Sequence, residues 1–377
     1  MKVLYSCLSK SWGGMEMFTL TAVKQLIKRN INVELVCIAE SRLHIEANNI
    51  GIIIHPVKAS GYVHLISTIK LSSIIRKAKY DIIHTQASKD LWLLVPALKL
   101  IKSGIPLILT KQVGSAVIKK DRLHKWIYGR LTYALAISMV IQKNLIETCP
   151  LPEEKIVLLH NAIDTKIFDP VKADGKKVRD EFKLRNDEIV IGMLARFSPG
   201  KGHEEFLKAA FELNKKHGNL KFLIVGEASR GENAYAESIK KLAVEYKLEN
   251  LIFTGFRSDT PDVLSAMDIF VFPSHGEAFG IALAEAMAMG KTSVCSNSDG
   301  ILDIAIDGVT SYLFENKNSH DLSKRIELLI TSPEKRNEFG FAARKRAVEN
   351  FDLEALTDKV LNIYSVAINQ HKKAAHE

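Results

Sequence analysis

The sequence predicts an α/β protein built from two doubly wound parallel sheets. Short runs rich in aliphatic and β-branched residues alternate with helical patterns along all 377 residues, which is typical of parallel sheets covered by helices. The length is about two to three times that of a usual single domain. The composition, 47% hydrophobic and 25% charged with 10 Pro, fits a globular protein rather than a disordered or fibrous one.

Six predicted strands and the helical stretches between them make up the first half of the chain. The strands are Val3–Cys7, Asn32–Ile38, Ile52–His55, Ile82–Thr85, Leu107–Thr110 and Ala134–Ser138. Ligands of such sheets bind outside the carboxyl ends of the strands. We therefore predict one Rossmann-like domain over residues 1–165, with functional residues directly after its strands.

A second series of strands follows a polar segment, residues 171–187, that has little hydrophobic periodicity. These strands are Ile189–Leu194, Lys221–Val225, Leu251–Thr254, Ile269–Phe272 and Thr292–Cys295. The end of the chain is helical in pattern over 321–330, 333–350 and 353–368. We predict a second Rossmann-like domain over 166–350 that faces the first across a cleft, and a C-terminal helix within 351–377 as a candidate to return to the first domain.

The net charge of +9 is concentrated in the first half. Residues 1–165 contain 22 Lys and Arg against 11 Asp and Glu, whereas the remainder contains 30 against 32. A surface charged in this way attracts an anionic partner within about a Debye length, roughly 8 to 10 Å at physiological salt. From charge alone, nucleic acid, anionic lipid and a phosphorylated substrate all remain open.

Export and membrane spanning are not expected from the sequence. The longest apolar stretches, around 91–101 and 133–141, are far shorter than the roughly 18 residues of a membrane-spanning helix. The first residues run directly into a strand pattern without the features of a signal peptide. The four cysteines are scattered, with no CxxC pair and no histidine at metal-ligand spacing. We expect a cytoplasmic protein with reduced thiols.

Two adjacent glycines, Gly13 and Gly14, follow the first predicted strand and precede a helix. Their missing side chains let a ligand approach the backbone, and the amides of a first helical turn favour a negative group. A tight turn that needs glycine for its own geometry explains the pair equally well. The segment is not a GxGxxG fingerprint, and no GxxxxGK[ST] loop occurs in the chain.

A glycine-rich loop with two cations follows the first strand of the second domain. It carries Arg196 and Lys201 and leads into a helix at His203. A guanidinium fork and an ammonium point charge at a helix start suit a pyrophosphate. The alternative is a loop with two solvated charges.

The segment from Pro273 to Gly290 contains two glutamates on either side of a helix start. Glu277 comes shortly after a strand, and Glu285 lies about two turns into the following helix. The amides of Phe279, Gly280 and Ile281 begin that helix and suit a phosphate oxygen. Two carboxylates beside a phosphate site would repel the ligand unless they bonded to its hydroxyls, which points to a sugar nucleotide. The alternatives are a helix-capping acid for Glu277 and an ion pair within the helices for Glu285.

At these residues the sequence resembles the retaining glycosyltransferases of family 4, which have the GT-B fold. The two glutamates resemble that family's E-x7-E motif, and Gly192 with the cationic loop resembles its phosphate-binding loop. Further resemblances, in the same order along the chain, are Gly13-Gly14, Asn161-Ala162-Ile163-Asp164 and Gly300-Ile301-Leu302-Asp303. The resemblance spans nearly the whole chain.

The resemblance implies a role for each matching residue. Arg196 and Lys201 would neutralise the donor diphosphate, Glu285 would hold the ribose, and Glu277 would contact the transferred sugar. Backbone groups would complete the phosphate site, at Gly14, Phe279, Gly280 and Ile281. The second domain would thus bind the nucleotide sugar, and the first would bind the acceptor.

Some positions depart from the family pattern. Gln86 and Gln112 stand where family members often carry histidine, and glutamine can bond a sugar hydroxyl but cannot transfer a proton. Ala162 replaces the glycine of an Asn-Gly pair, and Asp303 replaces a late glutamate. On the acceptor side His84 is the nearest titratable residue, although a single histidine at a strand end is more often structural.

The predicted reaction needs neither a metal nor another cofactor. The chain has no D-x-D motif, so the two cations and the helix amides must stabilise the departing diphosphate. We expect a metal-independent retaining hexosyltransferase. It would move sugar from a nucleotide-diphosphate sugar, UDP-linked by family preference, to a glycan or glycolipid in cell-surface polysaccharide or lipopolysaccharide synthesis. The alternatives are a sugar-nucleotide epimerase of the same fold and a catalytically inactive, basic membrane-binding module.

The stretch 116–135 combines basic residues with Trp126 and Tyr128. Such a pattern suits a helix that lies on an anionic bilayer, which would place the protein on the inner face of the membrane. A packed helix with a solvated basic face is the alternative. A nucleic-acid partner is not expected, because no recognisable binding motif accompanies the charge.

Overall fold

The computed structural model describes residues 1–58, 61–228 and 231–376. It divides into two compact units, one of Met1–His160 with Glu354–Glu377 and one of Asn161–Leu353. The chain therefore enters the second unit after residue 160 and returns to the first unit for its last helix. The limits expected from the sequence, 165/166 and 350/351, lie a few residues away from these two crossings.

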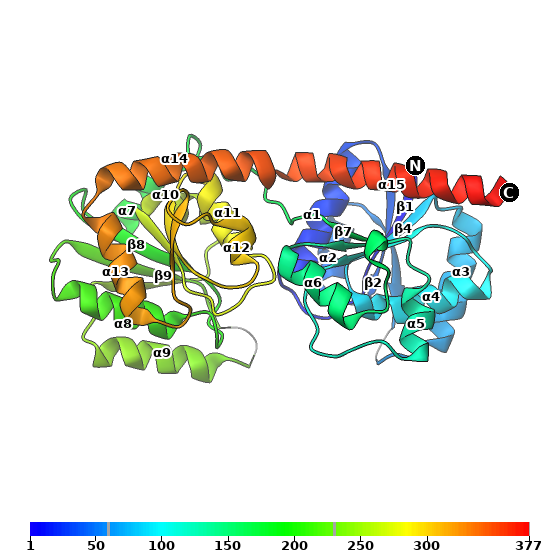
Figure 1. Cartoon of the computed structure of the whole chain (residues 1–377), viewed down its shortest axis with the longest axis horizontal. Helices are drawn as coiled ribbons and strands as arrows, with labels where there is room; N and C mark the ends of the chain where they lie inside the picture. Colours follow the sequence, from blue (N-terminus) through cyan, green and yellow to red (C-terminus); the bar gives the residue numbers. More distant parts are fainter. Residues whose placement is uncertain (59–60, 229–230, 377) are drawn as a thin grey trace. The chain divides into compact units, whose positions relative to one another are not determined.

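The first unit is a parallel sheet of seven strands within the described residues, in the order β3-β2-β1-β4-β5-β6-β7 (Figure 1). The strands are β1 (Lys2–Cys7), β2 (Asn32–Ile38), β3 (Ile53–Val57), β4 (Ile82–Thr85), β5 (Leu107–Lys111), β6 (Tyr133–Ala136) and β7 (Ile156–Leu158). The order reverses between β1 and β4, which makes the carboxyl ends of these two strands the expected place for a ligand.

The helices of the first unit cover this sheet. They are α1 (Gly14–Lys28), α2 (Arg42–Asn49), α3 (Leu65–Ala78), α4 (Leu91–Leu100), α5 (Arg122–Tyr128), α6 (Met139–Thr148) and α15 (Leu353–His376), with 3₁₀ turns η1 (Ser88–Asp90) and η2 (Glu153–Lys155). One apolar core joins strand residues such as Tyr5 and Leu35 to Val23 of α1, Leu43 of α2 and Tyr364 of α15. The C-terminal helix is thus an integral part of the first unit's core.

The second unit is a parallel sheet of six strands within the described residues, in the order β10-β9-β8-β11-β12-β13. The strands are β8 (Ile189–Leu194), β9 (Leu220–Val225), β10 (Leu251–Gly255), β11 (Ile269–Phe272), β12 (Thr292–Ser296) and β13 (Ser311–Phe314). The helices are α7 (Gly175–Glu181), α8 (His203–Asn214), α9 (Asn233–Glu245), α10 (Thr260–Ala266), α11 (Ile281–Ala288), α12 (Ile301–Ile304), α13 (Ser319–Ile330) and α14 (Pro333–Asn350). Here the strand order reverses between β8 and β11.

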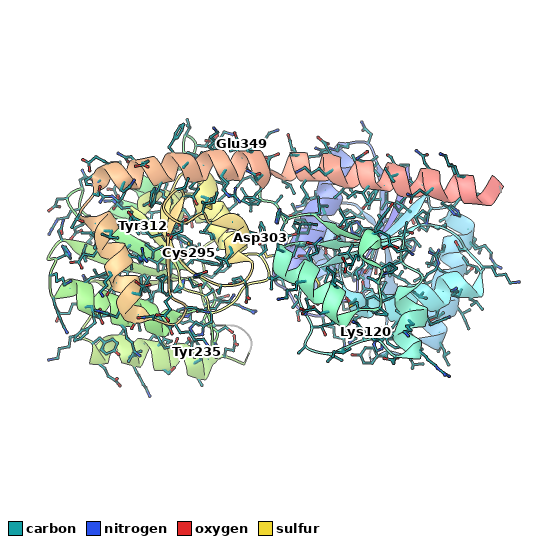
Figure 2. The ribbon with its side chains drawn as sticks, viewed as in Figure 1. Lys120, Tyr235, Cys295, Asp303, Tyr312 and Glu349 are labelled. Carbon is teal, nitrogen blue, oxygen red and sulfur yellow. The ribbon has the colours of Figure 1, made fainter. Side chains whose placement is uncertain are left out.

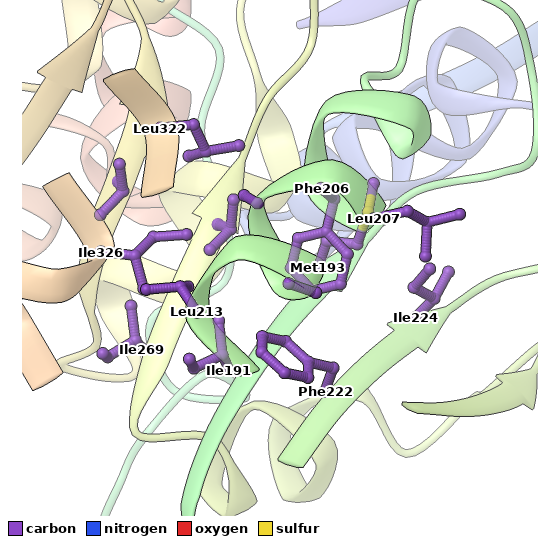
Figure 3. Packing of buried hydrophobic residues seen from close by; sticks show 14 of the residues in the cluster. Ile191, Met193, Phe206, Leu207, Leu213, Phe222, Ile224, Ile269, Leu322 and Ile326 are labelled. Carbon is purple, nitrogen blue, oxygen red and sulfur yellow. The ribbon is translucent and has the colours of Figure 1, made fainter. Parts of the chain in front are cut away.

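Aliphatic and aromatic side chains from strands and helices form the core of the second unit (Figure 3). Ile191 and Phe222 of neighbouring strands pack with Phe206 of α8 and Ile326 of α13. Each of these four side chains is almost completely buried. Full burial of such a side chain contributes roughly 1.5 to 3 kcal/mol, so this core holds β8 firmly at the centre of the sheet.

The structure corrects several details of the sequence analysis. The strand expected over 134–138 ends at Ala136, because Ser138 caps α6 by accepting a hydrogen bond from the Ile141 amide at 3.3 Å. The segment 171–187, in which the sequence shows little hydrophobic periodicity and no helix was predicted, contains α7. The strands β7 and β13 were not predicted, and α15 extends beyond the expected 353–368 to His376.

Two expectations about the whole chain can be compared with the structure. Among the residues that the structure describes, no helix is both long enough and apolar enough to cross a bilayer. All four cysteines are free and buried, and Cys295 lies within the second unit (Figure 2).

Candidate functional site

The loops after β8 and β11 meet at the point where the strand order of the second unit reverses. Lys201 comes from the first loop and Glu277 from the second, and their Nζ and Oε1 atoms lie 2.5 Å apart. These two side chains are about one fifth exposed. Sequence reasoning placed both residues in the site, but it did not predict that they form an ion pair.

Glycines allow the two loops to approach each other closely. Gly202 has φ +77° and caps α8, and a Cβ atom on it would lie 2.2 Å from the carbonyl oxygen of Pro273. Gly200 accepts a hydrogen bond from the amide of His275 at 2.8 Å. Packing against Pro273 therefore requires glycine at residue 202, whereas at residue 200 it is the φ of +84° that favours glycine. The close approach of the two loops holds Lys201 next to the β11 loop.

The two cations of the loop differ in their surroundings. Arg196 is exposed, and its guanidinium group has no hydrogen-bond or ion-pair partner in the described parts of the chain. Lys201 is paired with Glu277, but an ammonium group has three donors, so two remain after one reaches Glu277. Both cations can therefore bind a phosphate oxygen, and Lys201 can do so without releasing Glu277.

The first turn of α11 presents backbone donors beside this pair. Gly280 has φ +112° and is the N-cap, a conformation that favours glycine. The amides of Gly280, Ile281 and Ala282 donate to no acceptor within the described residues. Phe279, by contrast, is only 2% exposed, with its ring against Phe351, so the donors beside this ion pair are the three amides that follow it. Such amides attract an anion.

Glu285 lies on α11, one turn beyond Ile281. Its carboxylate makes no hydrogen bond or ion pair with any described residue, so the structure does not support the alternative of an ion pair among the helices. Burial raises the pKa of Glu285 to about 8. A partly buried carboxyl group without such partners is costly for the free protein, and a carboxyl group with so perturbed a pKa is typical of a functional site.

Residues that support the β11 loop were not identified by sequence reasoning, because no local motif marks them. His275 Nε2 lies 3.0 Å from Glu205 Oε1 of α8, and Asn316 donates from Nδ2 to the His275 carbonyl at 2.7 Å. The amide of Gly300 donates to the Glu277 carbonyl at 3.0 Å. These contacts come from three other loops or helices, and together they fix the backbone that carries Glu277.

The glycine turn of the first unit lies after β1, beside the reversal of strand order. The Gly13 amide donates to the Glu16 carboxylate at 2.9 Å, so this amide already has a partner. A Cβ atom on Gly14 would meet no atom within 4 Å. Packing within the chain therefore does not require glycine at residue 14, which favours the interpretation that a ligand approaches its backbone.

The three acceptor-side candidates lie in the buried interior of the first unit. His84 is 2% exposed, with Nε2 at 2.7 Å from Thr110 Oγ1 and Nδ1 at 2.5 Å from the Tyr364 hydroxyl of α15. Burial lowers the pKa of His84 to about 3. Both ring nitrogens are thus engaged and the ring stays neutral near pH 7, so the geometry favours a structural role.

The two glutamines lie closer to the end of the sheet. Gln112 donates from Nε2 to Gln86 Oε1 at 2.7 Å, and Gln86 donates in turn to the Tyr5 hydroxyl. Gln86 is 1% exposed and Gln112 7%. The pair is a connected polar cluster at the carboxyl ends of β4 and β5, where a ligand of this sheet is expected.

Comparison with known families agrees with this arrangement of motifs. Residues 12–167 match the family described as Glycosyltransferase Family 4, and residues 174–346 match the family described as Glycosyl transferases group 1. The chain belongs to glycosyltransferase family 4. It is therefore a nucleotide-sugar glycosyltransferase of a retaining family.

Relatives of this family member include enzymes of surface glycan synthesis. The UDP-Gal:alpha-D-GlcNAc-diphosphoundecaprenol alpha-1,3-galactosyltransferase of Escherichia coli is 26% identical over 79% of this chain and 78% of its own length. The N,N'-diacetylbacillosaminyl-diphospho-undecaprenol alpha-1,3-N-acetylgalactosaminyltransferase of Campylobacter jejuni is 27% identical over 79% and 80%. The capsular polysaccharide glycosyltransferase CapM of Staphylococcus aureus is 27% identical, and the match spans only 63% of either chain.

Solved structures confirm the predicted GT-B fold of this family 4 chain. A glycosyltransferase from Rickettsia africae has a TM-score of 0.89 at 22% identity, over 97% of this chain and 98% of its own. HepE from Anabaena, solved in complex with UDP and glucose, has a TM-score of 0.80 at 22% identity, over 97% and 99%. At this level of identity the likeness concerns the fold.

Proposed function

We propose that the protein transfers a sugar from a UDP-sugar to a lipid-linked glycan or glycolipid, with retention of configuration, in the synthesis of a cell-surface polysaccharide or lipopolysaccharide. The observation that carries this proposal is the ion pair of Lys201 and Glu277 beside the unpartnered Arg196 and the first turn of α11. The E. coli and C. jejuni relatives, whose names specify diphosphoundecaprenol-linked acceptors, support the acceptor class. The reaction would take place on the cytoplasmic side of the membrane.

The geometry suits the binding of a donor diphosphate to the second unit. Arg196 and Lys201 supply positive charge, and the amides of Gly280 and Ile281 supply directed donors. Glu285 is assigned to the ribose hydroxyls. Family resemblance also assigns a phosphate contact to the backbone of Gly14. Charge that develops on the leaving diphosphate is then stabilised by groups already in place.

Glu277 is assigned to a hydroxyl group of the transferred sugar. Lys201 donates to one of its oxygens, which leaves the second oxygen to accept a hydrogen bond from the sugar. The acceptor hydroxyl attacks from the face that the diphosphate leaves, and a phosphate oxygen receives its proton. A protein base is therefore unnecessary, so Gln86 and Gln112 can serve by bonding acceptor hydroxyls.

The test of this function is transfer from radiolabelled sugar nucleotides to a polyprenyl-diphosphate-linked sugar. Transfer or slow donor hydrolysis supports the proposal. Formation of an epimeric sugar nucleotide would instead establish the epimerase, and absence of any nucleotide binding would establish an inactive module. Retention is read from the anomeric configuration of the product by NMR.

Nucleoside diphosphates are expected to raise the thermal stability of the protein, with UDP giving the largest shift. A ligand at about 100 times its dissociation constant adds about 2.7 kcal/mol to the free energy of unfolding. A thermal-shift series with UDP, GDP and ADP measures this directly. Arg196→Ala serves as the control, because it should fold normally and respond less. An equal response to all three nucleotides would contradict the preference for uridine.

The activity is expected to persist in excess chelator. Arg196, Lys201 and the α11 amides are positioned to neutralise the phosphates, and no D-x-D motif is present to hold a divalent ion. The measurement is the initial rate with EDTA and after addition of Mg²⁺ or Mn²⁺. Complete loss with EDTA and recovery with either ion would show that a metal shares the phosphate chemistry.

A further inference from the structure

The positive charge of the first unit is concentrated in a segment that also exposes many large apolar side chains. Residues 58–130 contain 14 Lys and Arg against three acids. Among the described residues of this segment, eleven large apolar side chains are more than 40% exposed. Two of them are Leu100 and Val113, and the other nine are Tyr62, Val63, Leu65, Ile66, Ile69, Val117, Ile118, Leu123 and Trp126. The sequence analysis singled out only the second half of this group, in the stretch 116–135.

The two halves of this group are adjacent in the fold. The ring of Tyr62, just before α3, meets the ring of Trp92 in α4 at 5.2 Å between centroids. Trp92 in turn meets His124 of α5 at 5.4 Å. Helix α4 packs against both α3 and α5, and Figure 1 draws the three helices next to one another. We call the exposed residues of 62–69 and 117–126 the α3–α5 surface.

Helix α3 carries apolar side chains on two faces. Leu71 and Ile75 face the core and are at most 1% exposed. Leu65, Ile66 and Ile69 form a second stripe at i, i+1 and i+4 spacing, and they are 75%, 85% and 63% exposed. Single exposed apolar residues are common on protein surfaces, but a contiguous group of them marks an interaction site.

Basic side chains border the apolar group. Lys89 Nζ lies 6.0 Å from the centre of the Tyr62 ring. Further basic residues of the border are Lys58, Lys70, Lys119, Lys120, Arg122 and Lys125, of which Lys120 is labelled in Figure 2. Of the three acids in this segment, Asp121 is exposed, and its carboxylate pairs with the ring of His124.

The positive charge around the α3–α5 surface favours an anionic bilayer over a second copy of the chain as its partner. A symmetric contact between two copies of the chain would bring these basic borders together, because a twofold interface uses the same patch on both copies, and like charges repel. An anionic bilayer instead offers acyl chains to the apolar residues and negative headgroups to the lysines and arginines.

We propose that the α3–α5 surface docks on an anionic lipid bilayer. Side chains of the 62–69 segment enter the apolar layer, while the basic residues around α5 lie at the headgroups. The attachment is peripheral and reversible. This inference goes beyond the proposed glycosyl transfer. Its test is vesicle binding, which needs neither the sugar donor nor the acceptor.

The experiment is sedimentation of the full chain with vesicles of phosphatidylcholine alone or mixed with phosphatidylglycerol. We expect binding only to the anionic vesicles at low salt, because each Lys or Arg near such a surface strengthens binding by about fivefold. A variant with Lys119, Lys120, Arg122 and Lys125 changed to Ser should bind at least about tenfold more weakly, and its binding should depend less steeply on salt because Lys58, Lys70 and Lys89 remain.

A second variant separates apolar insertion from simple charge attraction. Leu65→Ser, Ile66→Ser and Ile69→Ser together should weaken vesicle binding at least about tenfold while the remaining binding stays sensitive to salt. The matched control is Val244→Ser with Phe341→Ser, two comparably exposed apolar residues of the second unit, which should bind as the unmodified chain does. Thermal unfolding confirms that each variant is folded.

Three outcomes would overturn the proposal. One is failure of the unmodified chain to bind anionic vesicles at low salt. Another is equal binding by the 65, 66 and 69 variant. The third is a dimer in sedimentation velocity that this variant dissociates, since the surface would then be an interface between copies. Transfer to a water-soluble acceptor analogue, measured in parallel, shows separately whether the proposed function holds.

Discussion

Alanine at Arg196 or Lys201 is expected to lower kcat by about 10²- to 10³-fold, which is the usual effect of removing one group that stabilises charge in the transition state. The exposed Arg196 side chain makes no hydrogen bond or ion pair with other described residues, so its removal should change the free energy of unfolding by no more than about 0.5 kcal/mol. The measurements are steady-state kinetics and chemical denaturation of the same preparations.

The two substitutions should differ in one respect. Lys201→Ala also removes the cation that pairs with Glu277, so this carboxylate loses its partner and KM for the donor should change as well. Lys216→Ala is the matched control, because Lys216 forms a comparable ion pair with Glu327 at 2.7 Å on the outside of the second unit. Activity that is unchanged in both site variants would contradict the phosphate assignment.

Donor binding is expected to depend on pH through Glu285. Its pKa of about 8 means that the carboxyl group is largely protonated at pH 7 in the free protein. A carboxylate that accepts from ribose hydroxyls must be ionised, so the dissociation constant of UDP should fall as the pH rises. If only the ionised form binds, the dissociation constant of UDP should fall by at most about 50-fold between pH 6 and pH 8.

Glu285→Gln is the variant that tests this dependence. Phosphate ionisation of UDP affects both proteins equally, so the ratio of their dissociation constants, measured by calorimetry at several pH values, isolates Glu285. The folded carboxyl retains its proton up to about pH 8, whereas the unfolded one releases it near 4.5. The free energy of unfolding of the unmodified protein should therefore decrease between these pH values relative to the variant. A constant ratio of dissociation constants would contradict the assignment.

Strands that lie inside the two sheets were predictable because they are buried on both faces. β2, β4, β8 and β11 have the same bounds in the sequence analysis and the structure. β7 and β13 are edge strands of three and four residues, with a neighbour on one side only. Such short strands need little apolar periodicity, so periodicity could not reveal them. Apolar character can also extend a prediction too far. The apolar run of β6 continues past Ala136, so the predicted strand included Ser138, which in the structure caps α6.

The residues of the candidate site were predictable where a local motif exists, and their contacts were not. Gly280 and Ile281 stand at a helix start that the sequence indicates directly. The ion pair of Lys201 with Glu277 joins residues 76 positions apart, and Glu205 reaches His275 from a different helix. Only the order of strands in the sheet brings these residues together, and the spacing of residues in the sequence does not encode that order.

The return of α15 to the first unit constrains how the chain is made. The first unit's core contains Tyr364, and His84 bonds its hydroxyl. Arg29 bonds Asp358 and the carbonyl of Glu354. During synthesis the ribosome must finish the whole second unit before these partners emerge, a delay of roughly ten to forty seconds at about 5 to 20 residues per second. Nascent chains must therefore keep a first sheet that still lacks one of its covering helices from aggregating. A gene fragment that stops at residue 160 encodes a unit without its last helix.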